Sequence, residues 1–218
     1  MFDNLFETIK NLSILLGVWL AIYGIDSWRR ELKGRREIEL AEETLALFYE
    51  ARDAIIHMRS IFSFNSETAD IERDSNETDA QFDSRKNASI VYKRYAEHQE
   101  VFNRLYSIRY RFMAQIGVKE AEPFDDLQKL VHEIFIAARR LAQLWPRNHF
   151  RTDEQYEKHL AQVEKYEAIF WEGIENEDPI NLRLEAIMQT IEKTCRNIVS
   201  GKGTLFGMLN KRIFKRRL

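Results

Sequence analysis

An uncharged run, NLSILLGVWLAIYGI at residues 11–25, places the strongest constraint on how this chain can fold. Basic residues follow it closely, at Arg29, Arg30, Lys33, Arg35 and Arg36. A helix that is apolar on all faces needs a core or a lipid environment, and cations beside such a helix favour the head groups of a membrane. We therefore predict a membrane anchor in residues 1–28.

The predicted span covers residues 9–28. The uncharged run alone reaches about 22 Å at ~1.5 Å per residue, which is short of the ~30 Å hydrocarbon core. The longer span places Lys10 and Asp26 at the two interfaces, where the lysine amine can reach the head groups while its stem stays apolar. Aromatic side chains, which favour the interface, gather toward the C-terminal end of the span at Trp19, Tyr23 and Trp28.

The charges on the two flanks predict the orientation. Acidic Asp3 and Glu7 precede the run together with Lys10, whereas the five basic residues follow it. The positive-inside rule then puts the N-terminus outside and the rest of the chain in the cytoplasm. We expect a single-pass protein of the cell membrane, which is the inner membrane in a cell that has two.

Three other interpretations of the run were weighed. A cleaved signal peptide is disfavoured, because the start is acidic and no small-x-small site follows. A helix lying flat on the membrane needs a strongly charged face, which residues 12–25 lack. A buried helix of a soluble protein leaves the adjoining basic cluster without a role.

The rest of the chain is typical of an all-α protein. The full chain of 218 residues contains only 8 Gly and 3 Pro, and after the anchor apolar residues recur at intervals of three and four. We predict that the anchor continues into a cytoplasmic antiparallel bundle of about five helices, with packing of the coiled-coil type. The predicted helices cover residues 27–62, 87–115, 125–145, 152–174 and 178–201.

Local signals mark where several of these helices begin and end. Thr152 and Gln155 match a capping box, and Asp178 followed by Pro179 is a typical helix start. Helix ends are predicted at Pro146, Gly117 and Gly201. Arg52 and Arg59 lie one heptad apart beside the apolar stripe, so we expect them to pair with carboxylates of a neighbouring helix.

The predicted organisation has five parts. Residues 1–28 form the anchor, and residues 29–63 contain the basic cluster and the first bundle helix. Residues 64–86 form an acidic polar loop, which is a candidate partner contact. Residues 87–201 complete the bundle. The tail, residues 202–218, is basic and amphipathic, and we expect it either to lie on anionic lipid head groups or to be solvated, through Lys211, Arg212, Lys215, Arg216 and Arg217.

No motif points to catalysis, to a cofactor or to a protein family. The histidines, at 57, 98, 132, 149 and 159, have no metal-binding spacing, and His98 is predicted as a core residue. Acidic residues between 70 and 76 alternate as in a calcium loop, but Ser75 replaces the required glycine and Gln81 the required glutamate. Cys195, the only cysteine, is predicted as a buried apolar residue.

We predict no nucleic-acid binding, because helical spacing sorts the segment YSIRYRF at 106–112 into core and solvent faces. The leading hypothesis is a non-enzymatic, membrane-anchored interaction module whose partners are the lipid bilayer and a protein or a second copy. One alternative is a soluble binding or oligomerisation domain with a buried N-terminal helix. The other is an enzyme whose site is assembled from scattered residues within the bundle.

Overall fold

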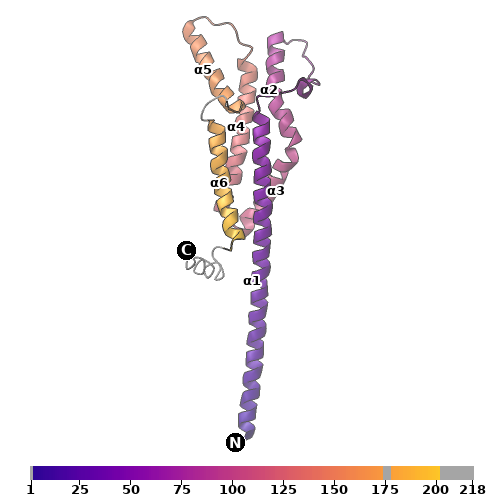
Figure 1. Ribbon diagram of the computed structural model, residues 1–218, viewed down its shortest axis with the longest axis vertical. Helices are drawn as coiled ribbons and strands as arrows, with labels where there is room; N and C mark the ends of the chain where they lie inside the picture. The colour runs from indigo at the N-terminus through magenta and orange to yellow at the C-terminus, as the bar shows by residue number, and fades with distance from the viewer. Residues whose placement is uncertain (1, 174–177, 202–218) are drawn as a thin grey trace, which may run out of the picture.

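A computed structural model describes residues 2–173 and 178–201, and over these residues the chain is all-α (Figure 1). Six α-helices and no strand occur there, which confirms the predicted helical bundle. The helices are α1 (Phe2–Arg59), α2 (Asp79–Glu97), α3 (Gln99–Gln115), α4 (Glu122–Leu144), α5 (Asp153–Phe170) and α6 (Pro179–Val199). Two short 3₁₀ helices, η1 (Asn65–Thr68) and η2 (Lys119–Ala121), lie in the connections.

Helix α1 has two halves with different surroundings. Its 58 residues extend over about 87 Å at ~1.5 Å per residue. From Leu40 onward one face of the helix is buried, including Leu40, Leu47, Phe48, Ile55 and Met58, and this half packs against α2, α3 and α6. The N-terminal half extends alone below the bundle (Figure 1), and every residue from 12 to 33 is exposed. One helix therefore supplies both the centre of the bundle and a rod that leaves it.

The core lies between α1 and α4. Helix α4 packs against α2, α5 and α6, so the two long helices hold the others around them. Phe48 of α1 meets Phe124 of α4 edge-to-face, with ring centroids 4.9 Å apart. Helix α6 closes the core with side chains at intervals of three and four: Leu184, Ile187, Met188, Ile191 and Cys195.

The predicted membrane span needs a correction. None of the helices, over the residues that the structure describes, combines the length with the hydropathy that a crossing of the bilayer requires. The hydropathy of the described helix therefore does not support the span predicted at residues 9–28. Beyond Ile25 the described helix carries Asp26, Arg29 and Arg30, whose charges lower its hydropathy.

The helix predicted at residues 87–115 is two helices. Helix α2 ends at Glu97 and α3 begins at Gln99, with His98 between them. Helix α2 also begins earlier than expected, because Thr78 and Gln81 form a capping box that the polar composition of this segment had concealed. The loop predicted at residues 64–86 is therefore shorter than expected.

The other helix signals are confirmed. Thr152 accepts a hydrogen bond from the Gln155 amide, although the Gln155 side chain reaches back to the Arg151 amide instead of completing the box. Asp178 caps α6 by accepting from two backbone amides. Helix α4 ends before Pro146. Gly117 and Gly201, at φ of 151° and 61°, end α3 and α6 in a backbone conformation that favours glycine.

A fully buried arginine, Arg59, joins α1 to the ends of α5 and α6. Its guanidinium lies 2.9 Å from the Asp178 carboxylate. It also donates hydrogen bonds to the last carbonyls of α5, at Ala168, Ile169 and Trp171. Arg59 thus satisfies carbonyls that a helix end leaves free, and its positive charge faces the negative end of the helix dipole. Arg52, in contrast, pairs with its exposed neighbour Asp53.

This difference predicts how two arginine substitutions change stability. Arg59→Met leaves a buried carboxylate and several carbonyls unpaired, so we expect the free energy of unfolding to fall by about 3–5 kcal/mol. Arg52→Met, the matched control on the same helix, changes it by roughly 0.5 kcal/mol or less. Urea unfolding in detergent micelles, followed by circular dichroism, measures both. Equal losses for the two variants would contradict the assignment.

Asp178 also predicts an acid-sensitive contribution to stability. Burial acts to raise its pKa, but the hydrogen bonds from Arg59 and from the amides of Asn181 and Gly173 outweigh burial, so the pKa lies below the ordinary 3.8. Because the folded-state pKa is lowered, the stabilisation is complete above 3.8 and is lost as the pH falls through the lower folded-state pKa. Asp178→Asn should flatten the acid limb of unfolding free energy against pH, whereas the control Asp53→Asn should leave it unchanged.

Candidate functional site

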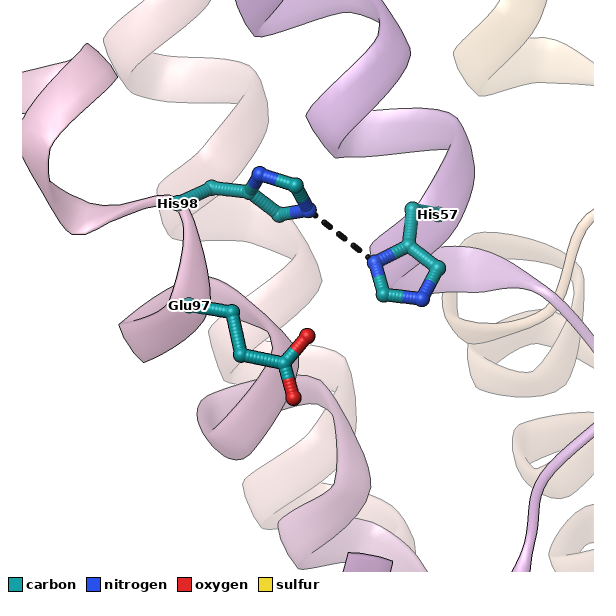
Figure 2. Close-up of side chains that lie close together, drawn as sticks. All are labelled: His57, Glu97 and His98. Atoms are coloured by element: carbon teal, nitrogen blue, oxygen red, sulfur yellow. Dashed lines mark hydrogen bonds between the residues drawn. The ribbon is translucent and has the colours of Figure 1, made fainter.

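Three side chains with metal-binding atoms meet where α1 ends (Figure 2). His57 lies in the last turn of α1, Glu97 ends α2, and His98 separates α2 from α3. His57 Nδ1 lies 3.0 Å from His98 Nε2, and one ligand atom from each of the three residues lies within 4.8 Å of the other two. His57 and Glu97 are exposed and His98 is half-buried. Two imidazoles and a carboxylate therefore converge at the surface of the bundle.

The two helices that carry these residues are fixed to each other by a second buried arginine. Arg94 of α2 donates hydrogen bonds to the carbonyls of His57, Ser60 and Phe62, and it pairs with Glu67 at 2.8 Å. The hydrogen bond from Arg94, opposed by burial, holds the pKa of Glu67 below its usual range. Because the Arg94 guanidinium binds backbone carbonyls at the end of α1, the His57 side chain is held beside the α2–α3 junction.

The backbone at His98 explains why its side chain leaves the core. With φ of −105° and ψ of 9°, this residue departs from helical geometry and ends α2. Its ring therefore turns toward α1 instead of continuing the apolar stripe, and it stacks edge-on against His57 with ring centroids 5.2 Å apart. At the 3.0 Å separation of their facing nitrogens, one ring donates its N–H to the other, in a direction that depends on the tautomers.

Sequence reasoning missed this cluster. It predicted no metal site and placed His98 in the core, because that prediction assumed an unbroken helix through residue 98. His57 is 41 positions from His98, and no spacing rule connects residues that far apart. The other histidines lie elsewhere: His132 is exposed on α4, His149 follows α4, and His159 lies against Phe150. The adjacent Glu97 and His98 were the only local signal.

The residues predicted at a membrane interface all lie on the free half of α1. Lys10, Trp19, Tyr23, Trp28 and the basic cluster at Arg29, Arg30, Lys33, Arg35 and Arg36 are exposed. Trp19 stacks on Tyr23 with ring centroids 5.7 Å apart. Acidic residues one turn away pair with Arg30, Lys33 and Arg35, so these pairs reduce the local positive charge of the cluster. The basic tail residues, Lys211, Arg212, Lys215, Arg216 and Arg217, lie outside the described residues.

The acidic segment between α1 and α2 is tied to the bundle by ion pairs. Glu77 pairs with Arg85 at 2.7 Å, and Asp70 pairs with Lys93. A polar groove lies between this segment and α4, and three of the charged residues that line it bind one another: Arg73 and Arg85 both donate to Glu77. Much of the acidic charge predicted as a partner contact is therefore used to fix the segment in place.

Cys195 is a core residue, as predicted. Its side chain is fully buried on α6, and burial raises the pKa of the thiol to about 12. A nucleophilic or metal-binding cysteine needs an accessible, low-pKa thiol, so this position does not provide one.

Comparisons with protein-family models, with curated proteins and with solved structures find no match to this chain. The geometry of its own residues therefore carries the functional argument.

The burial of Cys195 predicts slow modification. In the folded protein we expect maleimide to label it at least ~100-fold more slowly than in urea, because the thiol is enclosed and protonated. The control is Ser200→Cys in a Cys195→Ala background, which presents a thiol on the exposed turn after α6. Mass spectrometry follows both reactions, and equal rates for the two thiols would refute the burial.

Proposed function

We propose that this chain is a membrane-anchored interaction module. In this proposal the free half of α1 lies in lipid, and the helical bundle is presented to a protein partner or to a second copy at the cytoplasmic face. The observation that carries the proposal is the uncovered apolar rod, in which every residue from 12 to 33 is exposed. The rod lies outside the bundle, and the other helices that the structure describes do not cover it (Figure 1).

The free energy gained by moving the exposed apolar side chains out of water supports a lipid environment. Large apolar residues on the rod expose more than half of their surface: Leu12, Ile14, Leu15, Leu16, Val18, Trp19, Leu20, Ile22, Tyr23, Ile25 and Trp28. Full burial of such a side chain is worth about 1.5–3 kcal/mol, so together they favour an apolar cover by on the order of 20 kcal/mol. A rod of this kind has a strong tendency to leave water.

The arrangement around the helix axis favours lipid over a second helix. Leu15, Val18 and Leu20 point in three directions, because successive residues turn by about 100°. A coiled-coil partner covers one stripe and needs a polar outer face, whereas a bilayer covers all faces. The aromatic pair Trp19 and Tyr23, followed by the basic cluster, has the order expected where a helix leaves the hydrocarbon for cytoplasmic head groups.

Within this proposal, α1 crosses the bilayer once. It uses residues 9–28 as the span, with Lys10 and Asp26 at the interfaces, the N-terminus outside and the bundle inside. Lys10 is exposed, and the carboxylate of Asp26 pairs with Arg30 at 3.8 Å, which lowers the energy of an acid at the interface. The tail at residues 202–218 would add a weaker attraction to anionic lipid through its basic residues.

A candidate surface for the protein partner lies at the other end of α1. Residues 61–64 follow this end and include two exposed phenylalanines. Phe62 exposes 86% of its surface and Phe64 exposes 75%. The Arg94 guanidinium donates a hydrogen bond to the Phe62 carbonyl. This contact fixes the short segment, so the two rings are presented by an ordered surface. Exposed aromatic residues on an ordered segment are frequent anchors of protein–protein interfaces. The anchor and this surface are separated by the length of the bundle.

The membrane proposal predicts a position-specific effect of one charge. Leu16→Arg places a cation in the middle of the proposed span, which costs about 2.5–3.5 kcal/mol, so we expect membrane partitioning to fall roughly a hundredfold. The matched control is Leu182→Arg on α6, because Leu16 and Leu182 are 57% and 56% exposed. The measurement is the fraction that floats with phosphatidylcholine–phosphatidylglycerol vesicles, with alkaline carbonate washing to remove surface-bound protein.

Two results would count against the proposal. One is that the wild-type chain stays with the soluble fraction as a defined oligomer, which would favour self-association of the rod. The other is that Leu16→Arg and Leu182→Arg float equally well. Cysteines placed before and after the rod, tested for reaction with a membrane-impermeant maleimide, separate a crossing from a helix lying in one leaflet.

A further inference from the structure

We propose that His57, Glu97 and His98 form a binding site for a divalent transition-metal ion, with Zn²⁺ as the best match. The bound ion would join the end of α1 to the junction of α2 and α3. This inference does not rest on the membrane proposal, because the three ligands belong to the bundle and lie at the opposite end of α1 from the rod.

The chemistry of the ligands selects the metal class. Two imidazole nitrogens and one carboxylate oxygen are ligands typical of zinc, and they also suit cobalt and nickel, whereas Ca²⁺ and Mg²⁺ prefer an all-oxygen set. Three protein ligands leave a fourth position for water. The cluster contains no cysteine, which distinguishes it from the usual closed structural zinc sites.

The two imidazoles need only a small adjustment, and a side-chain rotation brings in the Glu97 carboxylate, whose oxygen lies within 4.8 Å of both. Tetrahedral zinc with bonds of ~2.05 Å places two nitrogen ligands ~3.3 Å apart. His57 Nδ1 and His98 Nε2 are 3.0 Å apart, so a shift of a few tenths of an ångström admits the ion. Figure 2 shows the carboxylate of Glu97 beside the facing nitrogens of the two rings. Because His57 and Glu97 are exposed, an ion can enter without opening the bundle.

The surroundings position the ligands without competing for them. Arg94 donates to the backbone carbonyl of His57, and its guanidinium charge is paired with Glu67, which reduces its repulsion of the ion. The backbone turn at His98 aims its ring at α1. The metal would therefore add a link between segments that the buried Arg94 already brings together. This link borders residues 61–64, whose motion it would restrict.

The test is metal titration of the full-length chain in detergent micelles, with any histidine tag removed. Zn²⁺ is titrated by calorimetry and Co²⁺ by visible absorption, which reports coordination number and shows no thiolate band if Cys195 is not a ligand. The variants are His57→Ala, His98→Ala and Glu97→Gln. The matched control is His132→Ala, which removes an exposed histidine from α4. Circular dichroism of each variant verifies that the fold is retained.

We expect one equivalent of Zn²⁺ to bind. The affinity should fall at least ~100-fold in His57→Ala and His98→Ala and roughly tenfold in Glu97→Gln, with no change in His132→Ala. Zinc should raise the unfolding temperature of the wild type and of His132→Ala but not of His57→Ala. Binding that is unchanged in His57→Ala, that is lost equally in His132→Ala, or that does not occur in the wild type would overturn the proposal. His57→Gln serves as a second variant if His57→Ala does not fold.

Discussion

One helix in this protein has to satisfy two environments, and the rest of the structure depends on that constraint. The C-terminal half of α1 buries one face in the core from Leu40 onward, and removing it would leave α2, α3 and α6 without the surface they share. Residues 12–25 in its N-terminal half are uncharged on all faces, and none of the described helices covers them. Because an α-helix is stiff over this length, the position of the rod fixes the position of the bundle. Whatever surrounds residues 12–28 therefore sets where and how the bundle is displayed.

Two buried arginines fix the end of the bundle that is farthest from the rod. Arg59 closes the ends of α5 and α6 against α1, and Arg94 closes the end of α1 against α2. Each binds helix-end carbonyls together with one carboxylate, so the guanidinium charge and its hydrogen bonds are satisfied within the protein. The order that they impose holds His57 beside His98 and presents Phe62 and Phe64 at the surface. The candidate metal site and the candidate partner surface thus depend on the same contacts.

The sequence correctly predicted features that depend on residues within a single helix. Apolar periodicity predicted the bundle, and local side chains such as Thr152 and Asp178 marked helix starts, because capping involves neighbouring residues. It also predicted that Arg59 would pair with a neighbouring helix. It missed the break at His98 and the approach of His57, because these depend on contacts between segments far apart in the chain. Thr78 was overlooked since its capping box lies in a segment whose polar composition resembles a loop. The uncharged run at residues 11–25 suggested a crossing, but none of the described helices is both long enough and apolar enough for one.

Amide hydrogen exchange of the full-length chain, with and without phosphatidylcholine–phosphatidylglycerol vesicles, tests the central claim most directly. An apolar rod in lipid has its amides shielded from water, whereas the same helix alone in water opens and exchanges. The account predicts that vesicles protect residues 12–28 strongly while the amides of the bundle, residues 40–59 and 79–199, exchange as before. Unchanged exchange of residues 12–28 would contradict it. Protection that appears without lipid and grows with protein concentration would contradict it equally, because a second copy would then be the cover.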